Sequence, residues 1–89
     1  MCRNIRTLYN FDPPATAEEI HSSSLQYVRK ISGFNQPSKA NQQAFAEAVD
    51  AVARVSSELL AKLSTTAPPR DREIEAAKAR ARAAQRFAA

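Results

Sequence analysis

The stretch Asp12-Pro13-Pro14-Ala15-Thr16-Ala17-Glu18-Glu19-Ile20 decides the fold, because it carries the start signals of a helix. The two prolines favour an extended approach. The Thr16 hydroxyl can accept a bond from the backbone N–H of Glu19, whose side chain can reach back to Thr16, as in a capping box. One helical face then follows at three- and four-residue spacing: Ala17, Ile20, Ser24, Tyr27, Val28 and Ile31. Gly33 suits a left-handed C-terminal cap, so we expect a helix over about 16–32.

Two further helices are expected downstream. Ser38 is the expected cap of a helix over about 38–64. Its expected buried side consists of Phe45, Val49, Val52, Val55, Leu59, Leu60 and Leu63. The third helix, over about 69–88, consists mostly of strong helix formers. Its only large apolar residues are Ile74 and Phe87, so we expect it to be weakly attached.

The composition favours a single all-α domain over residues 1–89. The chain holds 18 alanines, one glycine and no tryptophan, and strands favour β-branched and aromatic residues instead. The arm, residues 1–15, carries Ile5, Leu8, Tyr9 and Phe11 and is too apolar for a free tail. We therefore predict a small three-helix arrangement with the N-terminal arm packed on the bundle.

Several strings together resemble a bacterial family catalogued as domain of unknown function 2277. The strings are Met1-Cys2-Arg3-Asn4-Ile5-Arg6-Thr7-Leu8, Pro13-Pro14-Ala15-Thr16, Val28-Arg29-Lys30-Ile31-Ser32-Gly33, Pro37-Ser38-Lys39-Ala40-Asn41 and Thr65-Thr66-Ala67-Pro68-Pro69-Arg70. The resemblance implies a class of protein but no activity, cofactor or binding site, because the family has no established function.

Several classes of function are excluded by what the chain lacks. One cysteine and one histidine cannot form a zinc site within one chain, and one glycine cannot form a phosphate-binding loop or a dinucleotide fingerprint. We expect no metal and no cofactor. No stretch approaches the ~20 apolar residues of a membrane span, and no signal-peptide pattern opens the chain. A cytoplasmic protein is therefore expected.

The basic third helix is the main argument for a binding function. Residues 70–89 carry six Lys and Arg against three Asp and Glu. The candidate phosphate contacts are Lys78, Arg80, Arg82 and Arg86. An acidic protein or a lipid surface would suit the same charges. A solvated face is the structural alternative, since acids at the start and bases at the end of a helix complement its dipole.

Cys2 and His21 are the candidate catalytic residues. If Met1 is removed, the Cys2 thiol lies beside a free α-amino group that can act as an intramolecular base. Arg3 and Arg6 would favour the thiolate, and His21 is the alternative base. A thiol enzyme or redox protein would show fast alkylation of Cys2 at pH 7. The structural alternatives are an inert thiol near a chain end and a half-buried, packed histidine.

The sequence thus predicts a small protein that acts by binding rather than catalysis. Nucleic-acid association through the basic helix is the first alternative, and thiol chemistry at Cys2 is the second. The alanine-rich face of the third helix would also suit close packing against a partner helix. A homo-oligomer or a protein partner is therefore a further hypothesis.

Overall fold

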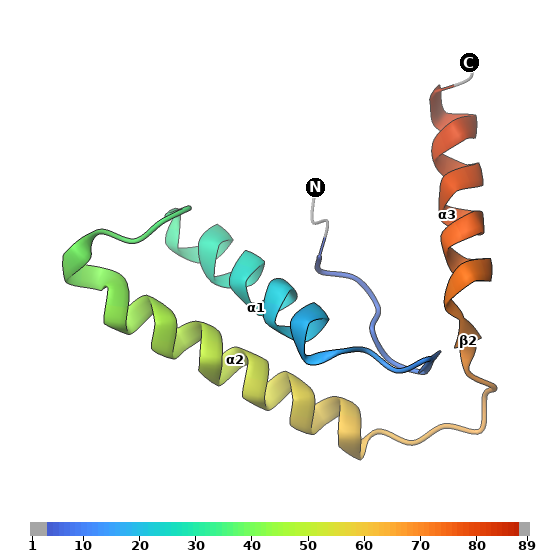
Figure 1. Cartoon of the computed structure of the whole chain (residues 1–89), viewed down its shortest axis with the longest axis horizontal. Coiled ribbons are helices and arrows are strands. Elements are labelled where there is room, and N and C mark those ends of the chain that lie inside the picture. The colour runs from blue at the N-terminus through green and yellow to red at the C-terminus, as the bar shows by residue number, and fades with distance from the viewer. Residues whose placement is uncertain (1–3, 88–89) are drawn as a thin grey trace.

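Three helices dominate the computed structural model, which describes residues 4–87 (Figure 1). In chain order the elements are β1 (Phe11–Asp12), α1 (Ala17–Ser32), the short 3₁₀ helix η1 (Lys39–Asn41), α2 (Gln42–Lys62), β2 (Arg70–Asp71) and α3 (Arg72–Phe87). The predicted predominantly helical, three-helix fold is confirmed. The two-residue strands were not predicted.

The capping box predicted at the start of α1 is present. The Glu19 backbone N–H donates to Thr16 Oγ1 at 3.1 Å, and the Thr16 backbone N–H donates to Glu19 Oε1 at 2.9 Å. At the other end Gly33 is left-handed with φ 78°, and its N–H donates to the Arg29 carbonyl at 2.9 Å. Both signals act within a few residues, so the sequence was sufficient to predict them.

The second helix is shorter than predicted. Ser38 caps η1, not α2: its carbonyl accepts from the Asn41 N–H at 2.9 Å and its hydroxyl from Asn41 Nδ2 at 2.9 Å. The α-helical bonds therefore begin at Gln42. At the far end Leu63 is extended with ψ 143°, although its N–H still donates to the Leu59 carbonyl at 3.0 Å. The expected range of 38–64 was thus too long at both ends.

α1 and α2 run antiparallel and pack side by side as a hairpin with a small core (Figure 1). Ile20, Val28 and Val49 are its buried apolar residues, and Ser24 is buried with its hydroxyl donating to the Ile20 carbonyl at 2.8 Å. Five residues predicted for the buried faces are instead 44–66% exposed: Tyr27, Ile31, Val55, Leu59 and Leu63. They are exposed because, within residues 4–87, α1 and α2 pack extensively only against each other and the N-terminal arm covers only part of the hairpin.

The third helix begins three residues later than predicted. Arg70 and Asp71 are extended and pair in parallel with Phe11 and Asp12, in the register Phe11–Arg70 and Asp12–Asp71. Asp71 then caps α3, since its Oδ1 accepts from the Ile74 N–H at 3.0 Å. The prolines before it therefore belong to a strand approach and not to the first helical turn, as the predicted range of 69–88 assumed.

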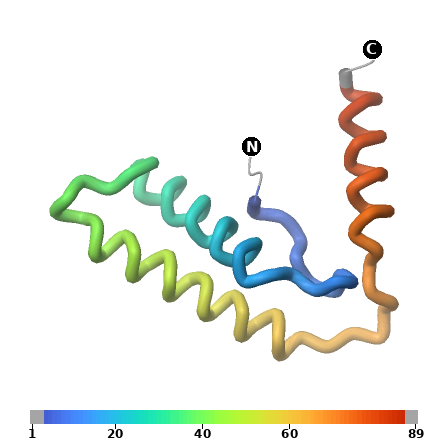
Figure 2. The backbone as a smooth tube through the Cα atoms, viewed as in Figure 1, coloured from blue at the N-terminus to red at the C-terminus, as the bar shows by residue number. Residues whose placement is uncertain are grey.

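The N-terminal arm lies against α1, as predicted. Gln26 Oε1 accepts from the backbone N–H groups of Asn4 and Ile5 at 3.0 and 3.1 Å. Ser23 Oγ donates to the Asn4 carbonyl. The N-terminal arm runs between the hairpin and α3, and α3 projects away from the hairpin in the C-terminal part of the chain (Figure 2). The molecule is consequently flat and open, with extents of 44 × 39 × 16 Å.

Candidate binding surfaces

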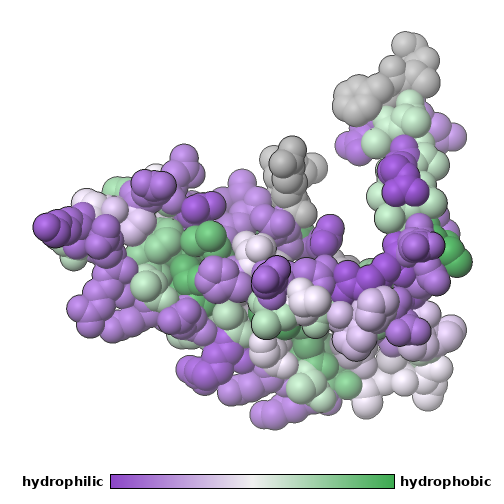
Figure 3. Space-filling view, viewed as in Figure 1, coloured by the Kyte–Doolittle hydropathy of each residue, from purple (hydrophilic) through white to green (hydrophobic). Residues whose placement is uncertain are grey.

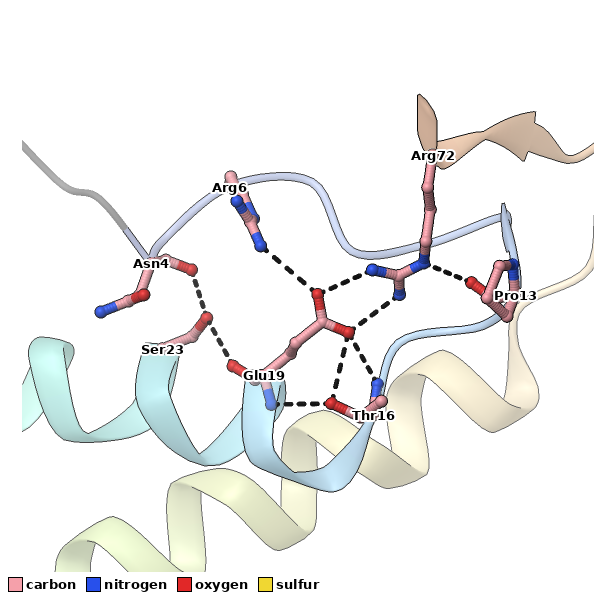
Figure 4. A network of polar contacts seen from close by, with 7 residues as sticks. All are labelled: Asn4, Arg6, Pro13, Thr16, Glu19, Ser23 and Arg72. Carbon is pink, nitrogen blue, oxygen red and sulfur yellow. Dashed lines mark hydrogen bonds and ion pairs between the residues drawn. The ribbon is translucent and has the colours of Figure 1, made fainter. Parts of the chain in front are cut away.

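One carboxylate joins the arm, α1 and α3 (Figure 4). Glu19 receives two bonds from the Arg72 guanidinium, from Nη1 to Oε2 at 2.9 Å and from Nη2 to Oε1 at 2.8 Å. Arg6 Nη2 adds a bond to Oε2 at 3.3 Å, and Arg72 Nε donates to the Pro13 carbonyl at 2.6 Å. We call Arg6, Pro13, Thr16, Glu19 and Arg72 the Glu19 clamp. It fixes the first residue of α3 to the first turn of α1.

The clamp holds Glu19 in its ionised form. The hydrogen bonds from the Arg72 side chain and then from the Thr16 backbone lower the pKa of Glu19 from 4.5 to about 2, against a smaller opposing effect of burial. The same carboxylate raises the pKa of Arg72. The guanidinium carbons of Arg70 and Arg72 also lie 5.8 and 5.7 Å from the centre of the Phe11 ring. A carboxylate held this way suits positioning of α3 and not proton transfer.

Sequence reasoning found only the local half of the clamp. The Thr16–Glu19 capping box followed from its spacing, whereas Arg72 lies 53 residues from Glu19. Any of the basic residues of the third helix could have met that carboxylate, and no spacing rule selects Arg72. The parallel pairing of β1 with β2 places it, and that pairing is too short to leave a sequence pattern.

A shallow groove of about 320 Å³ runs where the arm meets the hairpin. Its apolar lining includes Ile5, Leu8, Ile20, Tyr27, Val52 and Leu59, and its only charged lining residue is Arg6, which pairs with Glu19. Val55 extends the surface, because it lies three residues after Val52 and four before Leu59 on the same side of α2. We call Ile5, Tyr27, Val52, Val55 and Leu59 the apolar face. Hydrophobic surface shows between polar stretches of the hairpin in Figure 3.

The predicted phosphate contacts all lie on α3 and are all exposed. Lys78, Arg82 and Arg86 follow one another at four-residue steps, which forms one row along the helix, whereas Arg80, two residues after Lys78, lies nearly on the opposite side of the helix. Lys78 Nζ pairs with Glu75 at 3.2 Å. The three arginines make no ion pair with any side chain within residues 4–87. We call Lys78, Arg80, Arg82 and Arg86 the basic row.

Of the two candidate catalytic residues, His21 lies within the part of the chain that the structure describes. Cys2 lies outside residues 4–87, so thiol chemistry there remains a prediction. His21 is exposed on α1, contrary to the expected half-buried position, because it points away from the single neighbouring helix. Residues 4–87 contain no cluster of three or more metal-ligand side chains. No helix among them combines the length and the apolar character that crossing a membrane requires.

One comparison places the chain in a family. Neither the curated proteins nor the solved structures contain a match to it. The model of a family described as uncharacterized conserved protein (DUF2277) matches residues 1–78. The match includes the Glu19 clamp and the apolar face, and it ends at Lys78, before the other three residues of the basic row. The chain therefore belongs to the DUF2277 family of uncharacterized conserved proteins.

Proposed function

We propose that this protein acts by binding, without catalysis, and that the projecting helix α3 contacts the phosphates of nucleic acids. The observation that carries the proposal is the placement of the basic row. Its four cations are exposed on a helix that neither α1 nor α2 packs against extensively within residues 4–87. A helix placed this way can lie along a second molecule over most of its circumference.

The charges of α3 are separated along its length. Its acids, Glu73 and Glu75, are in the first turn beside the hairpin, and no acid follows among residues 76–89. The charged residues in the projecting part of α3 are therefore all basic. Over Lys78, Arg82 and Arg86 the row extends about 12 Å at 1.5 Å per residue, which spans several charges of a nucleic-acid duplex.

The Glu19 clamp supports this role because it holds the first residue of α3 in place. Cations whose positions are set before binding lower the cost of association, since ordering a free segment opposes it. The bidentate bond from Arg72 to Glu19 and the bond from Asp71 to the Ile74 N–H fix where α3 begins. The cations needed for binding are therefore distinct from the cation used for positioning.

Fluorescence anisotropy with labelled duplex DNA and single-stranded RNA, at about 50 mM salt, tests the proposal. Reversal of two charges in Arg82→Glu/Arg86→Glu removes two phosphate contacts. Counterion release then predicts that duplex binding weakens on the order of a hundredfold. The matched control is Lys39→Glu/Lys62→Glu, which changes the net charge equally but alters η1 and the end of α2.

The control variant is expected to bind within a few-fold of the natural chain. Equal weakening by both variants would mean that net charge alone attracts the nucleic acid, and the assignment of α3 would be wrong. Absence of binding to either nucleic acid at 50 mM salt would leave the basic row as a solvated face. An acidic protein or an anionic lipid surface would then be the partner to test.

A further inference from the structure

We propose that the apolar face is covered by the same face of a second copy of this chain, so that the protein is a two-fold symmetric homodimer. The proposal does not depend on nucleic-acid binding, because the apolar face lies on the N-terminal arm, α1 and α2, whereas the basic row lies on α3. It concerns the part of the chain that the family match covers.

A single copy lacks the interior that a chain of this size needs. Ile20, Val28 and Val49 are the buried apolar residues of the described chain, and each is 4–8% exposed. Chains below about 70–80 residues commonly add disulfides, a metal, cyclisation, idealised helix packing or oligomerisation to a small core. This chain has 89 residues, but its described part buries no more apolar side chains than such a chain would. One cysteine cannot form an internal disulfide, and residues 4–87 hold no metal-ligand cluster. Oligomerisation is the device that the exposed apolar face permits.

The exposed surface has the size that a dimer requires. The chain exposes 7150 Å². A compact monomer of 9.8 kDa would expose about 5,200 Å², so about 2,000 Å² per chain is in excess. The radius of gyration of 15.9 Å likewise exceeds the ~12 Å of a compact domain of this length. Part of this excess lies on the projecting α3, and a standard interface of about 800 Å² per partner on the N-terminal arm, α1 and α2 fits within the excess.

The chemistry of the face suits a second copy. Homodimer interfaces are apolar at their centre and poor in charge. Tyr27, Val55 and Leu59 are 47%, 56% and 55% exposed. The only charged residue that lines the groove, Arg6, is paired with Glu19, and Glu58, which follows Val55 by three residues, is paired with Arg54. A two-fold interface places one patch against itself, which an uncharged apolar patch permits without repulsion. No charge on the face would select a partner of opposite sign.

The mass of the full chain measured by sedimentation equilibrium is the test. We expect two chains of 9.8 kDa each at tens of micromolar. Val55→Asp should raise the dimer dissociation constant about a hundredfold or more, since it adds two buried carboxylates at the two-fold interface. The matched control is Ala46→Asp. Ala46 is also exposed on α2, but nine residues separate it from Val55, which places it on the opposite side of the helix.

Each outcome decides the proposal. A mass of one chain, or of more than two, overturns it, as does a dimer that Val55→Asp leaves intact or that Ala46→Asp disrupts equally. If Val55→Asp fails to fold, the natural chain provides the decision. Its melting temperature must rise with protein concentration for a dimer. A melting temperature that is constant over a hundredfold range of concentration overturns the proposal.

Discussion

A single side chain, that of Glu19, links three segments of this molecule. Its carboxylate closes the capping box of α1, accepts two bonds from the Arg72 guanidinium and receives a bond from Arg6 (Figure 4). Such bidentate pairs are stronger and more directional than single ion pairs. Because the Glu19 side chain is 20% exposed and Arg6 is 61% exposed, solvent screens part of this energy. We assign the clamp about 1–2 kcal/mol of stability.

Acid should release the clamp. The pKa of Glu19 is lowered to about 2 in the folded chain, below its usual 4.5. Its stabilisation is therefore complete above pH 4.5 and is lost as the pH falls from there toward 2. We expect Glu19→Gln to lower the free energy of unfolding by about 1–2 kcal/mol at pH 7 and by much less near pH 2. Urea unfolding at both pH values measures this.

Glu18→Gln is the control for this prediction. Glu18 lies in the same first turn of α1, and it makes no side-chain hydrogen bond or ion pair with residues 4–87. It should change the free energy of unfolding by less than about 0.5 kcal/mol. A Glu19→Gln effect that is the same at pH 7 and pH 2, or no larger than that of Glu18→Gln, would contradict the role given to the clamp.

At the scale of elements, the direction of α3 is set at its first residue. Arg72 alone connects the helix to Glu19 and to the Pro13 carbonyl. Arg72→Ala should therefore leave the helix content nearly unchanged and widen the range of orientations of α3. Spin labels at Ala51 on α2 and Ala84 on α3, in a Cys2→Ser chain diluted with unlabelled protein, report this as a broader distance distribution.

Arg70→Ala supplies the comparison for that experiment. Arg70 lies on β2 and its guanidinium is also near the Phe11 ring, but its side chain makes no bond to Glu19. Its backbone N–H, which donates to the Asn10 carbonyl at 2.8 Å, is unaffected by the substitution. We expect a distance distribution close to that of the natural chain. Equal broadening in both variants would show that the β1–β2 pairing, and not the clamp, directs α3.

Local signals predicted the elements, and contacts between distant segments decided the rest. Thr16, Glu19 and Gly33 set the bounds of α1 within a few residues of themselves, so the sequence sufficed. The start of α3 was misplaced because Arg70 pairs with Phe11, far away in the chain. Val55 and Leu59 were predicted to be buried because an apolar stripe indicates that something packs on it. The stripe does not indicate whether that is another segment of the chain or a second molecule. In one copy they are exposed.

The whole molecule combines the packed α1–α2 hairpin with the projecting helix α3. α3 has 16 residues, only slightly more than the ~12–15 below which isolated helices are marginal in water, whereas α1 and α2 support each other. Amide hydrogen exchange should therefore be slowest around Ser24, Val28 and Val49 and fastest in the distal part of α3. Protection of α3 equal to that of α1 would contradict a projecting arm and would indicate a cover that this structure does not hold.

The two proposals join at this scale. A homodimer formed through the apolar face carries two basic α3 helices, because the interface uses the N-terminal arm, α1 and α2 and leaves α3 of each copy outside it. Two arms on one nucleic acid would act at a high effective concentration and bind more tightly than one. The number of phosphate contacts that each α3 helix makes still determines how much that helix contributes to the salt dependence of binding.

The salt dependence of nucleic-acid binding tests the central claim, that α3 acts as a phosphate-binding arm. Fluorescence anisotropy of labelled duplex DNA between about 50 and 200 mM salt measures it directly. Four phosphate contacts predict a slope of log K against log salt near −3.6 for one arm, and about twice that where two arms of a dimer engage. Micromolar binding with such a slope would support the account. No binding at 50 mM salt, or binding with a slope near zero, would contradict it.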